Sequence, residues 1–389
     1  MTRSRWAAIA STCYVGTAAL TLLNGLPAIA VTLQDNRQLS NDAIGWLAAA
    51  HVLALGLSSA ACPYFLREFG ARTLIAIASI LVAIGFAVLG LCASPPPTYA
   101  GFILTGVGTG IANAVAYVLL GESHQERNVA VYYSAQWLST WLLLSAIPKI
   151  SLIAGLGGTF LCLAAFNVLS LATLPLIANS CTQLPVGVPG RARARIWLRS
   201  IALLGLCATF ACQGAIWTFL EIAGRRRGFL AAAVDAAAAG SAVFGLLGSL
   251  VAVVVGRRYG QTIPLFVSAG ALSLSLACMT DVHWVIYLSG VCLFTLSYSI
   301  FCAYIFGLAT DHDTSGFTAA WASTASCVGY ASGPAAAGAI SDVFGTNGVI
   351  GVGVVCAAIA FVAVAILLRT LPGHGWSTSD DCLATRGGG

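Results

Sequence analysis

The residues best suited to chemistry in this sequence are isolated amides inside long apolar stretches. Asn24, Asn113, Gln136 and Gln213 each stand in a mainly apolar segment, and Asn24 and Gln213 are each followed by glycine. An amide both donates and accepts hydrogen bonds, so it can recognise an uncharged polar solute. Polar side chains at helical spacing mark the face of an apolar helix that avoids lipid. The alternative is that these groups hydrogen-bond between packed helices.

Aromatic residues recur on the same helical faces as the amides. Trp217 lies one turn after Gln213, Tyr298 follows Thr295, and Tyr330 follows Ser326. A large ring beside an amide suits a solute that has both an apolar and a polar side. The pattern therefore predicts a set of solute-binding residues, which are Asn24, Asn113, Gln136, Gln213, Trp217, Tyr298 and Tyr330.

Three ionisable groups could bind a coupling proton: Glu221, Asp235 and His51. Glu221 ends one apolar segment, Asp235 lies near the start of the next, and His51 lies inside another. A carboxyl group in an apolar setting can bind a proton and release it on meeting water. One alternative is an ion pair between Glu221 and Arg225, one helical turn on. The other is that His51 is simply hydrogen-bonded to a neighbour.

The composition places these residues in a membrane protein. Hydrophobic residues make up 59% of the chain, charged residues only 8%, and the mean hydropathy is +0.90. Apolar segments long enough to cross about 30 Å of hydrocarbon recur from one end of the chain to the other. Each must be helical, because lipid offers no hydrogen-bond partner to the backbone N–H and C=O groups. We expect twelve spans, at residues 6–33, 43–66, 73–93, 99–121, 129–148, 157–179, 200–222, 231–256, 262–280, 284–308, 317–340 and 348–368.

The two halves of the chain repeat each other. The pair Asn24-Gly25 is matched by Gln213-Gly214, 189 residues later, and the run Arg67-Glu68-Phe69-Gly70 by Arg257-Arg258-Tyr259-Gly260, 190 residues later. Duplicated halves of a membrane protein commonly enclose a solute path at their interface. We therefore predict an all-α fold with two pseudo-symmetric six-helix bundles, at residues 1–180 and 200–370. The linker is 181–199, and the tail 371–389 is expected to be disordered and cytoplasmic.

The distribution of basic residues predicts the orientation of the chain. With the amino terminus in the cytoplasm, thirteen of the eighteen Lys and Arg residues fall on that side, which favours both termini inside the plasma membrane. The run Arg225 to Arg227 is the exception. It is either a solvated loop or an electropositive outer mouth that attracts anionic solutes.

Several other functions find no support in the sequence. There is one lysine and no Gly-x-x-x-x-Gly-Lys-[Ser/Thr] loop, which argues against a nucleotide-driven pump. No His-rich, paired-acid or nucleophile constellation lies at membrane depth, so we do not expect an enzyme. The thirteen cysteines have no metal-binding spacing. We expect no cofactor, no metal, no disulfide and no nucleic acid, and a monomer.

The chain resembles the major facilitator superfamily in its twelve spans, its two halves and its basic, glycine-containing loops after spans 2 and 8. That family's loop signature is roughly Gly-x-x-x-Asp-Arg-x-Gly-Arg-[Arg/Lys]. In the matching stretch 63–72, Gly70 and Arg72 agree, whereas Arg67-Glu68 inverts the acid and the base. The run from Gly329 to Pro334 is also similar to late helices of many members. The resemblance implies that spans 1, 4, 7 and 10 line a central cavity.

The resemblance also implies a cytoplasmic gate formed by the two loops. Its candidate residues are Arg67, Glu68, Gly70, Arg72, Glu122, Arg257, Arg258 and Gly260. Glu122 is the expected partner of the first loop. Two motifs of the family are missing, because Phe102 stands about where proton-coupled members carry an arginine, and the run Ser145 to Pro148 lacks the kink motif of drug antiporters.

We therefore expect a secondary active transporter that carries a small organic solute by alternating access and is driven by protons. No fixed cation lies in the middle of a predicted span, which favours a neutral, zwitterionic or amphiphilic solute over a dianion. One alternative is an efflux pump for hydrophobic drugs or other xenobiotics. Another is a non-transporting membrane sensor, which would need a sizeable soluble output domain that we do not find in this sequence.

Overall fold

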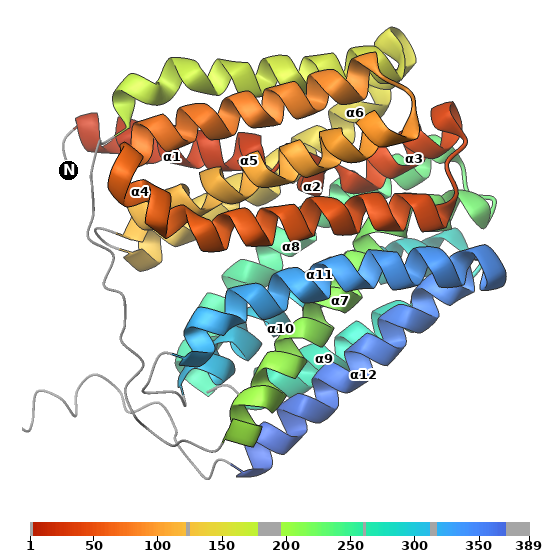
Figure 1. Cartoon of the computed structure of the whole chain (residues 1–389). Helices are drawn as coiled ribbons and strands as arrows, with labels where there is room; N and C mark the ends of the chain where they lie inside the picture. Colours follow the sequence, from red (N-terminus) through yellow and green to blue (C-terminus); the bar gives the residue numbers. More distant parts are fainter. Residues whose placement is uncertain (1–2, 122–124, 178–195, 260–261, 312–316, 371–389) are drawn as a thin grey trace, which may run out of the picture.

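A computed structural model describes residues 3–121, 125–177, 196–259, 262–311 and 317–370 (Figure 1). This part of the chain is helical apart from short connections, and it contains no strand. The elements are α1 (Arg3–Ala19), α2 (Thr21–Asn24), α3 (Leu26–Arg37), α4 (Asn41–Leu91), α5 (Pro95–Gly121), α6 (Gln125–Leu169), the 3-10 helix η1 (Ser170–Leu176), α7 (Ile196–Arg226), α8 (Ala231–Tyr259), α9 (Thr262–Cys278), α10 (Trp284–Asp311), α11 (Phe317–Phe344) and α12 (Thr346–Thr370).

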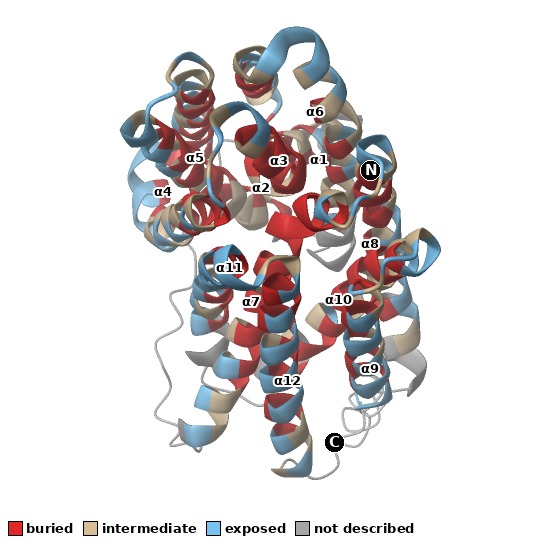
Figure 2. Cartoon of the chain, turned by 90° about the vertical axis from the view of Figure 1, so that its right-hand side faces the viewer, coloured by how far each residue is buried: buried red, intermediate tan, exposed pale blue. Residues whose placement is uncertain are grey.

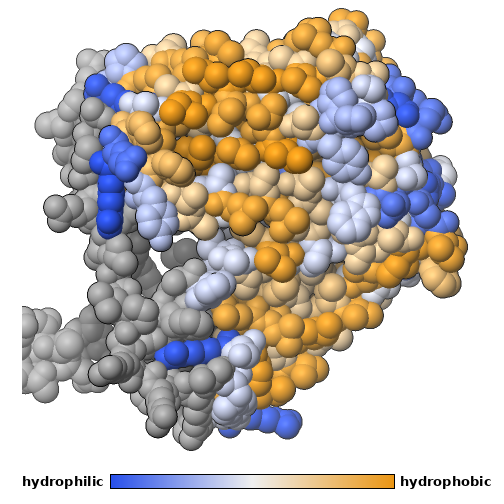
Figure 3. Space-filling model, viewed as in Figure 1, coloured by the Kyte–Doolittle hydropathy of each residue, from blue (hydrophilic) through white to orange (hydrophobic). Residues whose placement is uncertain are grey.

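These elements confirm the predicted fold of two six-helix bundles. Helices α1, α2 and α3 together form the first crossing, and α4 and α6 each contain two crossings. Gly70 (φ 73°) and Gly155 (φ 65°) mark the reversals inside α4 and α6, because glycine alone adopts positive φ at little cost. Seven described helices, counting α4 and α6 once each, are long and apolar enough to cross a membrane. Figure 3 shows a broad apolar surface with hydrophilic residues gathered towards its ends.

Some predicted boundaries of the spans differ from the structure. The fifth span was expected to end at Pro148, but α6 continues through Pro148 and Lys149 to the reversal at Gly155. The seventh extends to Arg226, so that Glu221 lies inside α7 rather than at its end. The predicted linker 181–199 and tail 371–389 lie mainly outside the described residues, and their boundaries stay predictions.

The molecule has two ends that differ in how the halves meet. We call the end where α1 and α7 begin and α12 finishes the linker end. The opposite end, which holds the turns after α3, α7 and α11, is the far end. In Figure 1 the two halves lie close together at the far end, on the right, and diverge towards the linker end. Figure 2 looks onto the far end and shows buried residues of α3 and α7 near the boundary between the halves.

The buried apolar residues follow the same division. One core cluster joins the two halves, with Leu22 and Leu26 of the first half and Trp217 and Ala337 of the second. Towards the linker end the core separates. One cluster there belongs to the second half alone, around Phe301, and another belongs to the first half alone. The halves therefore share one core at the far end and have separate cores at the linker end.

Close backbone contact between α4 and α11 holds the far end together. A Cβ on Gly45 would lie 2.2 Å from the Pro334 carbonyl oxygen, and a Cβ on Gly338 would lie 2.5 Å from that of Asn41. Only glycine permits these distances. The start of α4 is fixed beside this contact by Ser40, whose hydroxyl accepts a hydrogen bond from the Ala43 N–H.

We predict that Gly45→Ala destabilises the protein by about 1–3 kcal/mol, because the added methyl group has to push α4 away from the backbone of α11. The matched control is Gly351→Ala in α12, where a Cβ meets nothing within 4 Å. The control also measures the gain in helix propensity from alanine. Thermal unfolding of the purified variants compares the two, and equal melting temperatures would contradict the close contact.

Candidate functional site

The predicted solute-binding residues lie on helices that face one another across the boundary between the halves. Asn24 ends α2, Asn113 lies in α5 and Gln136 in α6, all in the first half. Gln213 and Trp217 lie in α7, Tyr298 in α10 and Tyr330 in α11, all in the second. The candidate site consists of two walls and the apex where they meet.

The first-half wall is a cluster of three tyrosines around Asn113. The hydroxyl of Tyr132 donates to Asn113 Oδ1 at 2.7 Å, and the ring of Tyr117 lies edge-on to Tyr132 at 5.4 Å. Tyr117 also donates to the Tyr133 hydroxyl at 3.2 Å. Tyr133 is 45% exposed, although it is also close to Cys302 of the other half. We therefore expect water between the halves to reach this ring.

Two features of the sequence position this tyrosine cluster. Gly16 of α1 makes room for Tyr132, because a Cβ there would lie 2.4 Å from its hydroxyl oxygen. Gln136 follows Tyr132 by one turn of α6 and lies beside the hydroxyls of Tyr117 and Tyr132. The wall therefore presents phenol and amide groups that already hydrogen-bond to one another.

The second-half wall is mainly aromatic. Tyr298 stacks on Phe294 with ring centroids 6.3 Å apart and meets Phe210 edge-on at 6.2 Å. Phe306 packs against the other side of this group, 5.7 Å from Phe210. Tyr330 packs over Gly214, where a Cβ would lie 3.2 Å from its Cδ1 atom. This wall offers mainly ring faces, with the hydroxyls of Tyr298 and Tyr330 as its hydrogen-bonding groups.

The apex contains the amide pair that the repeat relates. Gln213 is 5% exposed and its Oε1 has no hydrogen-bond partner, and the Nδ2 of Asn24 has none either. Trp217, one turn from Gln213, donates its indole N–H to the carbonyl oxygen of Leu23 at 3.2 Å, which joins the halves next to Asn24. An unpaired buried polar atom costs about 1–3 kcal/mol. Each of the two amides can therefore form a further hydrogen bond, either to a solute group or to a water molecule.

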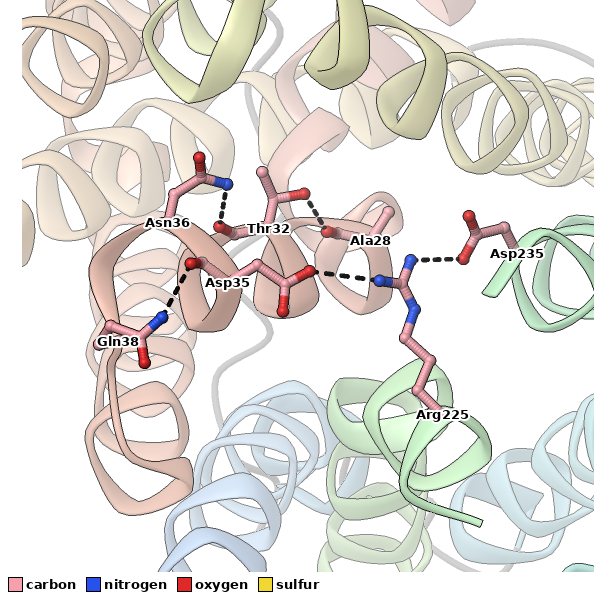
Figure 4. Close-up of polar contacts among 7 residues, drawn as sticks. All are labelled: Ala28, Thr32, Asp35, Asn36, Gln38, Arg225 and Asp235. Atoms are coloured by element: carbon pink, nitrogen blue, oxygen red, sulfur yellow. Dashed lines mark hydrogen bonds and ion pairs between the residues drawn. The ribbon is translucent and has the colours of Figure 1, made fainter. Parts of the chain in front are cut away.

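Glu221 is the most isolated acid of the candidate set. It is completely buried in α7, and neither carboxyl oxygen has a hydrogen-bond partner. The alternative ion pair with Arg225 does not form. Arg225 instead donates to Asp235 of α8 at 2.8 Å and to Asp35 of α3 at 3.3 Å (Figure 4). Asp235 is therefore paired in this structure, and Glu221 is not.

Each arginine of the run Arg225 to Arg227 has polar partners, and Arg226 is exposed, so the electropositive outer mouth stays a prediction. Arg225 forms ion pairs with Asp35 and Asp235. Arg226 contacts the amide of the buried Asn41. Arg227 donates to Thr346 at 3.0 Å and to Asn347 at 3.1 Å. The three side chains thus connect the end of α7 to neighbouring elements of both halves.

His51 lies inside the first half rather than at the boundary. Its Nδ1 is 3.1 Å from both the Phe102 carbonyl oxygen and the Thr105 hydroxyl of α5, and Nε2 has no partner. The ring of Phe102 meets it edge-on at 6.5 Å. This arrangement matches the alternative of a histidine hydrogen-bonded to its neighbours.

The basic loop after the second crossing contacts its own half. Arg72 donates to the carbonyl oxygens of Ile177 at 2.6 Å and Pro175 at 3.3 Å, which anchors the end of η1 in its own half. Arg67 and Glu68 are exposed. The expected partner Glu122 and Gly260 lie outside the described residues, as do the side chains of Arg257 and Arg258. The gate therefore stays a prediction.

The candidate list omitted Tyr132 and Phe210, which complete the two walls. Tyr132 could have been found from its one-turn spacing to Gln136. Phe210 carries no such signal, because nothing in an apolar run of α7 distinguishes it from neighbours that face lipid.

The comparisons with known proteins agree on the fold. The family model described as Major Facilitator Superfamily matches residues 12–312. A crystal structure of a mutant of the nucleoside transporter NupG has a TM-score of 0.73 at 11% identity, covering 94% of this chain and 100% of that one. A crystal structure of a D-xylose–proton symporter has a TM-score of 0.70 at 14% identity, covering 91% and 96%. No curated protein sequence is significantly similar to this chain.

We predict that a cysteine at Tyr133 reacts rapidly with a water-soluble thiol reagent, in a background without the native cysteines, because this side chain faces water between the halves. The control is Phe86→Cys, since Phe86 is fully buried inside the first half. Labelling rates of the purified variants in lipid nanodiscs compare the two positions. If Tyr133→Cys reacts as slowly as the control, the space between the halves is dry.

Proposed function

Because this chain belongs to the major facilitator superfamily, we propose that it is a secondary active transporter that carries a small organic solute by alternating access. One observation carries the proposal: the halves share a core at the far end and have separate cores at the linker end. Rocking the halves about the apex would close the linker end and open the far end. We place the linker end in the cytoplasm of a cell with the protein in its plasma membrane, as the distribution of basic residues indicates.

The proposed solute is neutral or zwitterionic and combines a ring or other flat apolar surface with hydrogen-bonding groups. Asn24 and Gln213 have unpaired amide atoms at the apex, and the walls present phenol and phenyl rings. The names of the two similar structures support a solute without a fixed charge, because a nucleoside and D-xylose are both neutral. Within this proposal Trp217 contacts solute after its hydrogen bond to Leu23 breaks.

Besides the shared core, opening of the far end would break several polar contacts between the halves. These include the hydrogen bond from Trp217 to Leu23, the ion pair of Arg225 with Asp35, the contact of Arg226 with Asn41, and the bond that the Asp342 carboxylate accepts from the backbone N–H of Asp42 at 3.3 Å. Each of these polar contacts is individually modest. Solute binding at the apex would compete with the contact made by Trp217.

Proton coupling is proposed at Glu221. A carboxylate buried without a partner costs several kcal/mol, so the uncharged form suits the closed far end. Water would reach Glu221 when α7 separates from the first half, and the proton could then leave. Asp235 is already paired with Arg225, and His51 is enclosed between α4 and α5, so both are weaker candidates.

Export of hydrophobic compounds is the second candidate function. The aromatic wall of Phe210, Tyr298 and Phe306 favours it, because such a surface binds apolar molecules of varied shape. The two candidates differ in how binding depends on the amides. A polar solute needs Asn24 and Gln213, whereas a hydrophobic one does not.

We predict that Gln213→Ala and Asn24→Ala each weaken solute binding by about 1–3 kcal/mol, because each removes one of the unpaired amides at the apex. Thermal-shift screening of the purified protein against neutral metabolites and hydrophobic drugs identifies ligands, and titration calorimetry measures their affinity. The control is Ser289→Ala on an exposed part of α10. Unchanged affinity in both amide variants would favour the hydrophobic exporter.

We predict that Glu221→Gln retains exchange of solute across proteoliposomes but loses accumulation driven by a pH gradient, because glutamine mimics the protonated acid permanently. Asp281→Asn, which changes an acid in the turn before α10, serves as the control and should accumulate solute normally. Uptake of the labelled ligand found in the screen provides the measurement. Full accumulation by Glu221→Gln would remove this residue from the coupling mechanism.

A further inference from the structure

Arg225 connects acids from both halves at the far end. Its guanidinium reaches Asp235 of α8 at 2.8 Å and Asp35 of α3 at 3.3 Å (Figure 4). The side chain of Asp235 is 17% exposed and that of Asp35 is 61% exposed. Asp235 belongs to the same half as Arg225, and Asp35 belongs to the other. Only the contact with Asp35 therefore depends on whether the halves are together.

A third acid lies within reach of Arg225 but is not bound by it. Glu221 is four residues earlier on α7, and a glutamate that precedes an arginine by one turn is in the favourable order for an ion pair. In this structure both of its carboxyl oxygens are buried without a partner. Arg225 forms ion pairs with Asp35 and Asp235 but not with Glu221, which is the most buried of the three acids.

The position of Glu221 explains why it is sealed. Trp217, one turn before it, and Arg225, one turn after it, both contact the first half, at Leu23 and at Asp35. Helix α3 packs against α7. The stretch of α7 that contains Glu221 is therefore covered because the far end is closed.

Few other titratable groups face Glu221 in the described part of the chain. Asp235 approaches it from α8, and Tyr287 from α10, where its hydroxyl donates to the Leu220 carbonyl oxygen. Arg227 lies beside Tyr287. All of these belong to the second half and would move with Glu221. Asp35 is the charged group that would leave.

We propose that Arg225 is a switchable counter-ion, shared between Asp35 and Glu221, that links closure of the far end to the protonation of Glu221. This inference rests on the proposed transport function. With the far end closed, Asp35 and Asp235 hold Arg225, and Glu221 carries a proton. When the halves separate there, Asp35 withdraws, the O–H bond of Glu221 breaks, its proton passes to a water molecule, and Arg225 turns to the new carboxylate.

Two contacts of Arg225 differ between the states of this mechanism: the one with Asp35 is lost on opening, and the one with Glu221 is formed. A conformational equilibrium shifts only through interactions that differ between its states. Asp235 contributes equally to both, so its part is to keep Arg225 near Glu221. Asp35 therefore acts as a positioning residue for the proton-binding site, although it lies in the other half of the molecule.

The test measures protonation of Glu221 while the far end is locked closed, so that opening cannot contribute. Ala49→Cys and Ala331→Cys, which lie in one contact cluster across the halves, provide the lock through a short thiol crosslinker. Infrared spectroscopy follows the band of the protonated carboxyl group during a pH titration, and the band that Glu221→Gln removes identifies the residue. No solute is needed, so failure of transport and failure of this inference are distinguishable.

We expect Asp35→Asn to lower the midpoint of this titration by about 1–3 pH units, because the released Arg225 turns to Glu221 and an opposite charge in contact has an effect of that size. In an Arg225→Gln background the same substitution should have no effect. A midpoint that does not move, or a shift that persists without Arg225, would overturn the inference. Asp35→Ala is a second variant should the asparagine variant fold poorly.

Discussion

The structure depends on one constraint: inside a membrane, each polar side chain has to find its partner within the protein. Most hydroxyls meet this need on their own helix. Thr17 donates to the Cys13 carbonyl oxygen at 2.8 Å, Thr140 to Gln136 at 2.9 Å and Thr209 to Gly205 at 2.7 Å. These threonines say little about function, because a hydroxyl that donates to a carbonyl oxygen of its own helix needs no partner from another helix. Three residues with unpaired atoms, Asn24, Gln213 and Glu221, lie where α2 and α3 meet α7, whereas His51 Nε2 and the Ser299 hydroxyl are unpaired elsewhere.

The shared core explains why these three residues lie there. A core that joins the halves at the far end packs α7 against α2 and α3, whereas Tyr117 and Tyr132 lie in a core cluster of the first half alone, beside the exposed Tyr133. It is an apolar core, and hydrogen bonds, one ion pair and close glycine packing add to it across the boundary. At Gly45 and Gly338 the backbones of α4 and α11 approach closely. Opening of the far end therefore separates apolar surfaces as well as these polar contacts.

The sequence allowed the fold to be predicted because the fold follows from apolar length, charge distribution and the repeat, all of which are local or periodic properties. The candidate amides were found in the same way. The contacts of the charged residues could not be predicted. One-turn spacing suggested Glu221 for Arg225, but its partners are Asp235 and an acid 190 residues away in sequence. Arg72 contacts carbonyl oxygens of its own half, which have no signature in the sequence, and Glu122, the expected partner of its loop, lies outside the described residues.

The repeat also shows where the two halves have diverged. A shift of 189 residues relates Gln213 to Asn24, and the amide is kept. The same shift relates Trp217 to Ala28, Glu221 to Thr32 and Arg225 to Asn36.

In the first half these equivalent positions hydrogen-bond along one helix. Thr32 donates to the Ala28 carbonyl oxygen at 2.7 Å and Asn36 to that of Thr32 at 2.9 Å (Figure 4). In the second half the same positions carry an aromatic ring, an acid and a base, and the ring of Trp217 and the guanidinium of Arg225 contact the first half. A symmetric amide pair suits a solute held between the halves, whereas a proton site needs a partner that approaches and withdraws. Glu221 and Arg225 on α7 meet that need, because movement of the first half changes their surroundings.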